Sequence, residues 1–521
     1  MVVLRSLVLS LLSFSVYALP TAESVAASAA GQFTCAGDIF TYQELAGYGV
    51  VSSDFRDKFG DTVSFGSSIA IERPSWKKNG ASYEGILWML PDRGWNTQGT
   101  SAYQPRVHKF QITFAPTLTA TPSPPNLKFS YLDTILFTDP SGNPISGLDP
   151  TTTLPFTGFA NLPASKFTGD GFGGSGSGGT RVSLDPEALV LGNDGFWIGD
   201  EYGPFIYHFD LSGKMNIAIK PPASIVPIRD GGENFASDNP PVYAPDLHPK
   251  PIDPSTGRSN NQGFEGLAVS GDGKTLYAVL QSATIQDGGL DKNTNRYARM
   301  VKYDITIPTQ PRYARQYVVP LPLYVDPSKK KPRTAAQSEL MSIGKEKFLM
   351  LSRDSGAGHG SDASESFYRQ IDVLNLAGAT DIKGTTFDAK ASSSITTSDD
   401  SGVLKSGITP ATYCPFVNMN DNTQLAKFGL HNGGAQNAAL LNEKWEGLAM
   451  MPVDGLDGDD DWWYVIAVSD NDFITQNGTY NFGKNKYSDK TGFNLDNQAM
   501  VFKIKLPDHS RPYDPTPVPI R

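Results

Sequence analysis

The sequence lacks long hydrophobic runs beyond its first residues, and it holds only two cysteines among 521 residues. No later stretch approaches the roughly 20 apolar residues that a membrane-spanning helix needs, so we expect no membrane partner. Two cysteines are too few for a zinc site made of thiolates. The Gly-x-Ser-x-Gly motif is also absent, which leaves a serine mechanism of the α/β-hydrolase type unsupported.

Positive charge is scarce as well. Lys and Arg number 44 against 54 Asp and Glu, which gives a formal net charge of −10. Phosphate backbones require a basic face, so we expect no nucleic-acid partner. The run Lys329-Lys330-Lys331 lies between prolines in an expected loop. An acidic monomer of this kind suits a bound cation and a small anionic or ester substrate.

The residues that are abundant favour strands. Gly 51 and Pro 38 are high, aromatic residues make up 11% of the chain, and apolar spacing with a period of 3.6 is hard to find. The composition therefore predicts an all-β fold, and all-β closed folds often form one long domain.

The N-terminus has the pattern of a secretory signal peptide. Arg5 precedes a short apolar run that ends in Val16-Tyr17-Ala18, which predicts residues 1–18 as a signal peptide and a secreted, extracellular protein. The run is too short for the alternative, a membrane anchor. Residues 19–40 are expected to be a flexible lead-in.

Two further features fit the extracellular compartment. Cys35 and Cys414 are the two cysteines, and in an oxidising environment we expect them to form a disulfide. The segment Asn477-Gly478-Thr479 is an N-glycosylation sequon, which predicts a glycoprotein and a surface loop.

A short phrase with an acid in a fixed place recurs down the chain. Phe264-Glu265-Gly266-Leu267-Ala268 and Trp445-Glu446-Gly447-Leu448-Ala449 are close copies. Looser copies place Glu187 and Glu339 at the matching position, whereas a fainter copy has Ser67 there. Each copy is followed by a turn and a second apolar run that usually ends in an acid: Asp92, Asp200, Asp354 or Asp470.

This repetition predicts a β-propeller with long loop insertions. We expect six blades, with five or seven as alternatives, over residues 41–506, followed by a proline-rich tail over residues 507–521. Strands that begin and end at one face would bring the acids together. Hard oxygen ligands favour Ca²⁺, with Mg²⁺ as the alternative. The expected metal ligands are Asp92, Glu187, Asp200, Glu265, Glu339, Glu446, Asp470 and Asp472.

Other residues beside these acids suit catalysis. Arg93 and Arg353 could bind an anionic group, Glu201 and Asp354 could exchange a proton, and His359 follows in a loop as an acid, base or ligand. For each one a structural role remains open. The acids could close turns, the arginines could form structural ion pairs, and the histidine could be incidental.

The segments Asp200-Glu201-Tyr202-Gly203-Pro204 and Asn261 to Val269, with Arg353-Asp354, resemble the phytase-like family, described as "esterase-like activity of phytase". The resemblance covers residues 65–505, with Ser67 and the long insertions as departures. It implies a secreted β-propeller that hydrolyses phosphoesters. The alternatives are lactone or carboxylester hydrolysis, and a non-catalytic propeller that binds a glycan or a protein.

Overall fold

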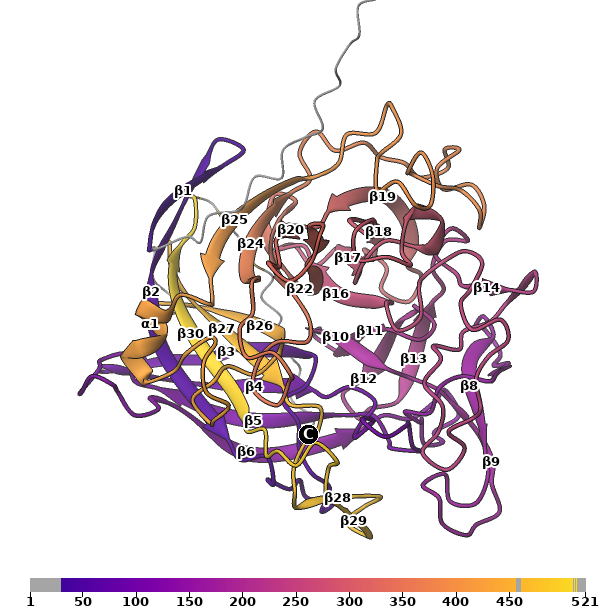
Figure 1. Cartoon of the computed structure of the whole chain (residues 1–521), viewed down its shortest axis with the longest axis horizontal. Coiled ribbons are helices and arrows are strands. Elements are labelled where there is room, and N and C mark those ends of the chain that lie inside the picture. The colour runs from indigo at the N-terminus through magenta and orange to yellow at the C-terminus, as the bar shows by residue number, and fades with distance from the viewer. Residues whose placement is uncertain (1–29, 456–460, 509, 511, 513–521) are drawn as a thin grey trace, which may run out of the picture.

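The computed structural model describes residues 30–455, 461–508, 510 and 512, and its regular secondary structure consists almost entirely of antiparallel strands joined by long loops (Figure 1). The predicted all-β class is confirmed. Within these residues no helix has the length and apolar character to cross a membrane. The predicted signal peptide lies outside the described residues. The helical segments are short: α1 (Asn422–Leu425) and the 3-10 helices η1 (Ile285–Asp287) and η2 (Ala426–Phe428).

Four sheets each contain four strands in chain order, joined by antiparallel pairing. The first sheet is β3 (Ser68–Asn79), β4 (Ser82–Leu90), β5 (Arg106–Phe114) and β6 (Leu127–Leu136), and the second is β10 (Pro186–Leu191), β11 (Gly195–Asp200), β12 (Ile206–Asp210) and β13 (Met215–Ile219). The third is β16 (Phe264–Val269), β17 (Thr275–Leu280), β18 (Tyr297–Asp304) and β19 (Arg312–Pro320), and the fourth is β22 (Ala336–Gly344), β23 (Lys347–Arg353), β24 (Arg369–Asn375) and β25 (Thr412–Asn418).

A fifth sheet combines strands from both ends of the chain. Its order is β1 (Gly31–Cys35), β2 (Asp38–Val51), β30 (Asn497–Lys505), β27 (Trp462–Asp470) and β26 (Lys444–Pro452). Residues 31–35 and 38–40, which the sequence assigned to a flexible lead-in, are therefore strand, because β1 pairs with β2 and β2 pairs with β30.

The predicted disulfide is confirmed. Cys35 at the end of β1 is joined to Cys414 in β25, and the two Cα atoms are 5.8 Å apart. The bond therefore links the outer edge of the fifth sheet to the outer edge of the fourth.

Small sheets build the loops around these five. They are β7 (Thr152–Leu154) with β8 (Leu162–Phe167) and β9 (Gly179–Val182); β14 (Ile228–Arg229) with β15 (Gly232–Glu233); β20 (Leu323–Tyr324) with β21 (Arg333–Thr334); and β28 (Gly478–Tyr480) with β29 (Asn485–Tyr487). Asn477 of the sequon is exposed just before β28.

The first strands of the five main sheets lie side by side. β3 contacts β10, β10 contacts β16, β16 contacts β22, β22 contacts β26, and β26 contacts β3. Apolar clusters fill the space between neighbouring sheets. Five first strands thus surround one axis.

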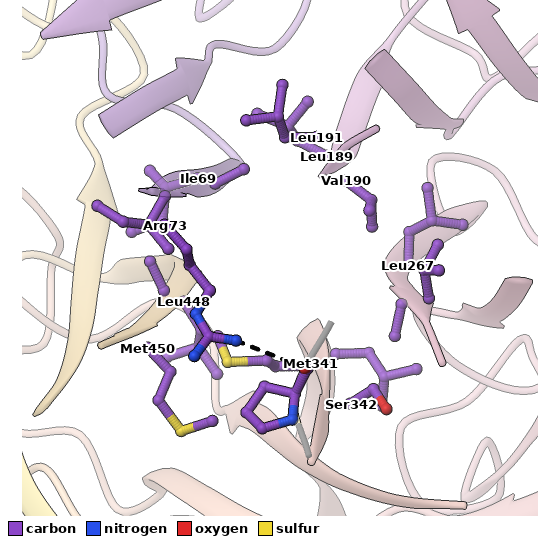
Figure 2. A pocket seen from close by; sticks show the side chains of 17 residues that line it. Ile69, Arg73, Leu189, Val190, Leu191, Leu267, Met341, Ser342, Leu448 and Met450 are labelled. Atoms are coloured by element: carbon purple, nitrogen blue, oxygen red, sulfur yellow. Dashed lines mark hydrogen bonds between the residues drawn. The ribbon is translucent and has the colours of Figure 1, made fainter. Parts of the chain in front are cut away.

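Inward side chains line that axis. In its apolar part they enclose a cavity of about 90 Å³, and the Arg73 guanidinium donates to the carbonyl of Pro512 across its mouth at 3.5 Å (Figure 2). Leu189, Leu267 and Leu448 each stand two residues after a repeat glutamate, so acids and apolar side chains occupy successive levels of the same strands.

Candidate functional site

The repeat glutamates sit at a shared irregularity near the start of the first strands. The pairing register shifts between Pro186 and Ala188, between Phe264 and Gly266, and between Trp445 and Gly447. The extra residue is the glutamate in each case: Glu187, Glu265 and Glu446. A bulge of this kind re-aims a side chain, and all three line one cavity.

In β22 the corresponding shift lies between Gln337 and Glu339, so the extra residue is Ser338. The match of Glu339 to the repeat glutamates is therefore wrong by one position. Glu339 accepts hydrogen bonds from Ser68 Oγ and, at 2.8 Å, from the Leu340 amide. Burial raises the pKa of its carboxyl well above the usual range. Glu339 does not line the cavity; it links β22 to β3.

The cavity encloses about 240 Å³ at the acidic ends of the first strands. Six lining residues are acids, four are cationic, and Ala336 is the one aliphatic side chain. The lining residues are Asp92, Arg93, Glu187, Glu201, Asn261, Gln262, Glu265, Gln281, Lys292, Asn295, Thr334, Ala336, Arg353, Ser355, Glu443, Lys444 and Glu446.

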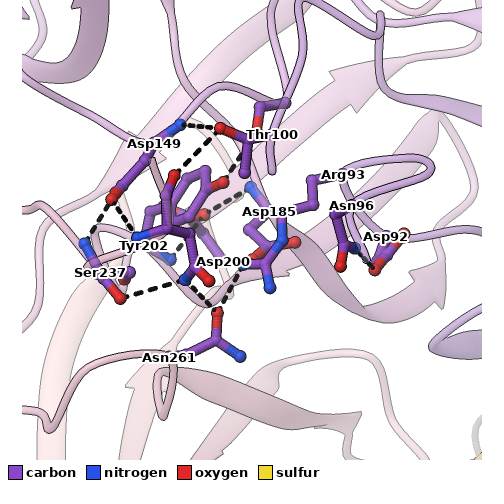
Figure 3. Close-up of polar contacts among 12 residues, drawn as sticks. Asp92, Arg93, Asn96, Thr100, Asp149, Asp185, Asp200, Tyr202, Ser237 and Asn261 are labelled. Carbon is purple, nitrogen blue, oxygen red and sulfur yellow. Dashed lines mark hydrogen bonds and ion pairs between the residues drawn. The ribbon is translucent and has the colours of Figure 1, made fainter. Parts of the chain in front are cut away.

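Arg93 lines the cavity and forms an ion pair with a buried acid, Asp185. Its Nη1 atom forms an ion pair with Asp185 and donates to Asn261 Oδ1 (Figure 3). The guanidinium also lies 5.7 Å from the ring centre of Tyr202. Asp185 Oδ1 is buried and has no hydrogen-bond partner among the described residues. Asp185 was not among the predicted site residues, although it stands two residues before Glu187.

Lys444 joins a second group of acids, and it was not predicted either. Its ammonium nitrogen lies 2.8 Å from Asp470 Oδ2, 2.9 Å from Asp472 Oδ1 and 3.7 Å from Glu446 Oε2. Asp470 Oδ1 also accepts from Ser64 Oγ at 2.7 Å. Burial alone would raise the pKa of Asp470, but Lys444 and these hydrogen bonds hold it below the usual range.

Arg353 forms the third ion pair of the cavity, with Glu446. Glu265 accepts a hydrogen bond from Gln281, which stands where the other second strands end in an acid. Glu443, also missed from the sequence, accepts from Ser361 Oγ at 2.7 Å. Each of these contacts joins residues from different loops or strands.

Several carboxyl oxygens in the cavity have no hydrogen-bond partner among the described residues. Glu187 is 4% exposed and has no hydrogen bond within the described part of the chain. Glu201 Oε1 and Glu265 Oε2 are also buried without a partner there. Burial, reinforced by neighbouring acids, raises the pKa of Glu187 and Glu265 well above the usual range and that of Glu201 to about 8. A bound cation or protons would relieve this repulsion.

Two predicted site acids turn away from the cavity. Asp200 accepts from the amides of Asp185 and Tyr202, both at 3.1 Å, and from the Gly203 amide at 2.7 Å. Burial raises its pKa to about 7. Asp354 accepts from Ser366 Oγ and from the Phe367 amide, both at 2.6 Å. Their contacts match the structural role left open for them.

The remaining predicted residues lie near the cavity without lining it. His359 packs its ring against Phe493, and burial lowers its pKa. Asp470 and Asp472 stand behind Lys444. The cavity thus contains Asp92, Arg93, Glu187, Glu201, Glu265, Arg353 and Glu446 from the predicted set.

Among the residues that the structure describes, two groups of acids have oxygen atoms close enough to hold a metal ion. They are Asp92 with Asp185 and Glu187, and Asp92 with Asp470 and Asp472, each with ligand atoms within 4.8 Å of one another. The first group fits a hard cation because Asp185 Oδ1 is buried without a partner and the Glu187 side chain forms no hydrogen bond or ion pair within the described residues. Asp92 is held in place by the Gly94 amide at 3.0 Å and the Asn96 amide group at 2.8 Å.

The family model "Phytase-like: Esterase-like activity of phytase" matches residues 80–473. An "Uncharacterized secreted protein" of Arthroderma benhamiae is 50% identical over 465 residues, which cover 86% of this chain and 90% of that protein.

Two solved structures were also matched. The WD40 domain of Toxoplasma gondii coronin has a TM-score of 0.27 at 8% identity, over 93% of this chain and 90% of that one. The Cps50 (Swd1) β-propeller domain of Myceliophteria thermophila has a TM-score of 0.26 at 10% identity, over 85% and 98%. No conclusion rests on likenesses at this level.

Proposed function

The chain belongs to the phytase-like family, and from that premise we propose that it is a secreted hydrolase of phosphoesters that works with a bound divalent cation. Secretion is supported by the N-terminal signal pattern and by the name of the Arthroderma benhamiae relative. We further infer that the fold is a β-propeller with five blades rather than six. The cyclic contacts of β3, β10, β16, β22 and β26 support this count.

One observation carries the proposed activity. The cavity places carboxyl oxygens that have no hydrogen-bond partner among the described residues beside the cationic side chains of Arg93, Lys292, Arg353 and Lys444, and Ala336 is its one aliphatic lining residue. A neutral lactone or carboxylester would find little apolar surface there. A small substrate with an anionic group would find paired charges of both signs. The lining therefore favours a phosphoester over the other esters.

Each residue can be given a role. Arg353 presents a planar, two-pronged donor that matches phosphate oxygen atoms. Glu201 lines the cavity with one unpartnered oxygen, and in the metal-free protein burial, followed by Asp185, raises the pKa of its carboxyl to about 8, so burial favours its protonated form. It is therefore suited to give a proton to the leaving-group oxygen.

Asp92, Asp185 and Glu187 would hold the cation, and their carboxylate oxygens suit a hard ion, Ca²⁺ or, as the alternative, Mg²⁺. When bound, the cation supplies positive charge that offsets the charge of the phosphoryl oxygens. Arg93 holds Asp185 by an ion pair, and Asn261 Oδ1 accepts from the same guanidinium nitrogen.

The test is a substrate panel run on chelator-treated protein with and without added calcium. The panel holds an aryl phosphomonoester, an aryl phosphodiester, a lactone and an aryl acetate. We expect calcium-dependent cleavage of the phosphoesters, and Arg353→Lys should raise KM for them by about tenfold because a point charge replaces the forked donor. Cleavage of the neutral esters alone, or of nothing at all, would refute the proposal.

A further inference from the structure

The two acidic groups that share Asp92 differ in what already occupies them. In the group of Asp92, Asp470 and Asp472, the ammonium of Lys444 lies within 2.9 Å of both Asp470 and Asp472. Lys444 extends from the first residue of β26, and Asp470 is the residue opposite it in β27. The ion pair is therefore built into the strand pairing.

An acid beside Lys444, Asp470, also accepts hydrogen bonds from other donors. Asp470 Oδ1 accepts from Ser64 Oγ at 2.7 Å and from the Asp472 amide at 2.8 Å. Its second oxygen is bound by Lys444 at 2.8 Å. A metal ion at this place would have to displace the ammonium.

The group of Asp92, Asp185 and Glu187 is different. Arg93 binds only one oxygen of Asp185, and the other is buried without a partner among the described residues. Glu187 lines the cavity and is 4% exposed. Its side chain has no hydrogen bond in the described part of the chain. A buried carboxyl group that no protein donor binds is able to coordinate a cation from the cavity.

We propose that Lys444 is the resident cation of the second group, so that the cavity takes one divalent ion, at Asp92, Asp185 and Glu187. This inference rests on the metal dependence in the proposed function and adds the number and place of the ion. Two cations that share Asp92 repel each other, and the ammonium on Asp470 and Asp472 makes a second divalent ion unfavourable there. Removing that ammonium should open a second site.

The experiment counts calcium ions bound per chain by equilibrium dialysis and by titration calorimetry. We expect one ion for the natural protein, two for Lys444→Gln, and one for Lys444→Arg, which keeps the charge and serves as the matched control. Glu187→Gln should lose the single ion.

If Lys444→Gln folds poorly, the variant Asp472→Asn provides an independent test of the same inference. Asp472 has φ of 50°, a left-handed conformation that asparagine tolerates, so this change keeps the backbone. It should retain one ion with affinity changed by less than about threefold, because Asp472 belongs only to the second group.

Several outcomes would overturn the inference. Two ions on the natural protein, or loss of the ion in Asp472→Asn, would refute it while leaving a calcium-dependent phosphoesterase intact. A single ion on well-folded Lys444→Gln would also refute it. Binding of no calcium to the natural protein would refute the metal dependence itself, and the inference with it.

Discussion

Replacing Glu201 by glutamine should stabilise the metal-free protein at neutral pH. Glu201 is 1% exposed, and one of its carboxyl oxygens has no partner within the described residues. Burial, and then Asp185, raise its pKa from 4.5 to about 8. A carboxyl whose pKa is raised on folding contributes stability that is complete below pH 4.5 and is lost as the pH rises toward 8.

The size of the effect follows from the shift. One pKa unit corresponds to about 1.4 kcal/mol, so the natural protein should lose about 3 kcal/mol at this position between pH 4.5 and pH 7. Glutamine is uncharged at both pH values and escapes that loss. For a chain of this length the entropy of unfolding is about 1 kcal/mol per degree, so Glu201→Gln should raise Tm by about 3 °C at pH 7.

The assay is thermal unfolding followed by circular dichroism in a chelator, at pH 4 and pH 7. The two proteins should unfold at the same temperature at pH 4 and diverge at pH 7. Glu365→Gln, at an exposed position, is the control and should show no divergence. Equal differences at both pH values, or a less stable Glu201→Gln at pH 7, would refute the reasoning about its burial.

Three further predictions follow from the site and the fold. Calcium at about 100 times its Kd should stabilise the protein by about 2.7 kcal/mol in thermal unfolding, and Asp92→Asn should abolish most of that gain; identical curves with calcium and with chelator would contradict it. Asp354→Asn should lower the free energy of unfolding by about 1–3 kcal/mol in denaturant, because an amide cannot accept all the hydrogen bonds from Ser366 and Phe367. Unchanged stability with lost turnover would instead show that Asp354 is catalytic. Cys414→Ser should cost about 2–4 kcal/mol by the same measurement, and a cost under about 1 kcal/mol would mean that the bond contributes little.

The repeated phrase predicted much of the fold correctly. Its two apolar runs are paired first and second strands of the sheets, as in β16 with β17. These features could be predicted because strand period and turn chemistry are local. The cyclic order of the five sheets depends on contacts between strands that are distant in sequence. The motif alone could therefore not predict how many sheets surround the axis.

The site was predicted less completely. Glu187, Glu265 and Glu446 were identified because the motif repeats around them, and they line the cavity. Glu339 was misplaced because a bulge is set by the hydrogen bonds of the neighbouring strand: Gln337 pairs with Ser352 and Glu339 with Leu351, which leaves Ser338 as the extra residue. The spacing to the next leucine carries the signal: Leu189, Leu267 and Leu448 stand two residues after their glutamates, whereas Leu340 stands two residues after Ser338.

The sequence by itself determined the strand content, the disulfide and the set of acids that recur near strand ends. Only the tertiary structure decided which acids face the cavity and which accept hydrogen bonds from backbone amides. Asp200 and Asp354 end their strands as predicted, yet nearby amides bind them, whereas Glu187 finds no donor. Lys444 and Arg93 gained their roles from acids 26 and 92 residues away in the chain. A buried charge is stabilised by whatever partner the fold brings within about 3 Å, and such partners are distant in sequence.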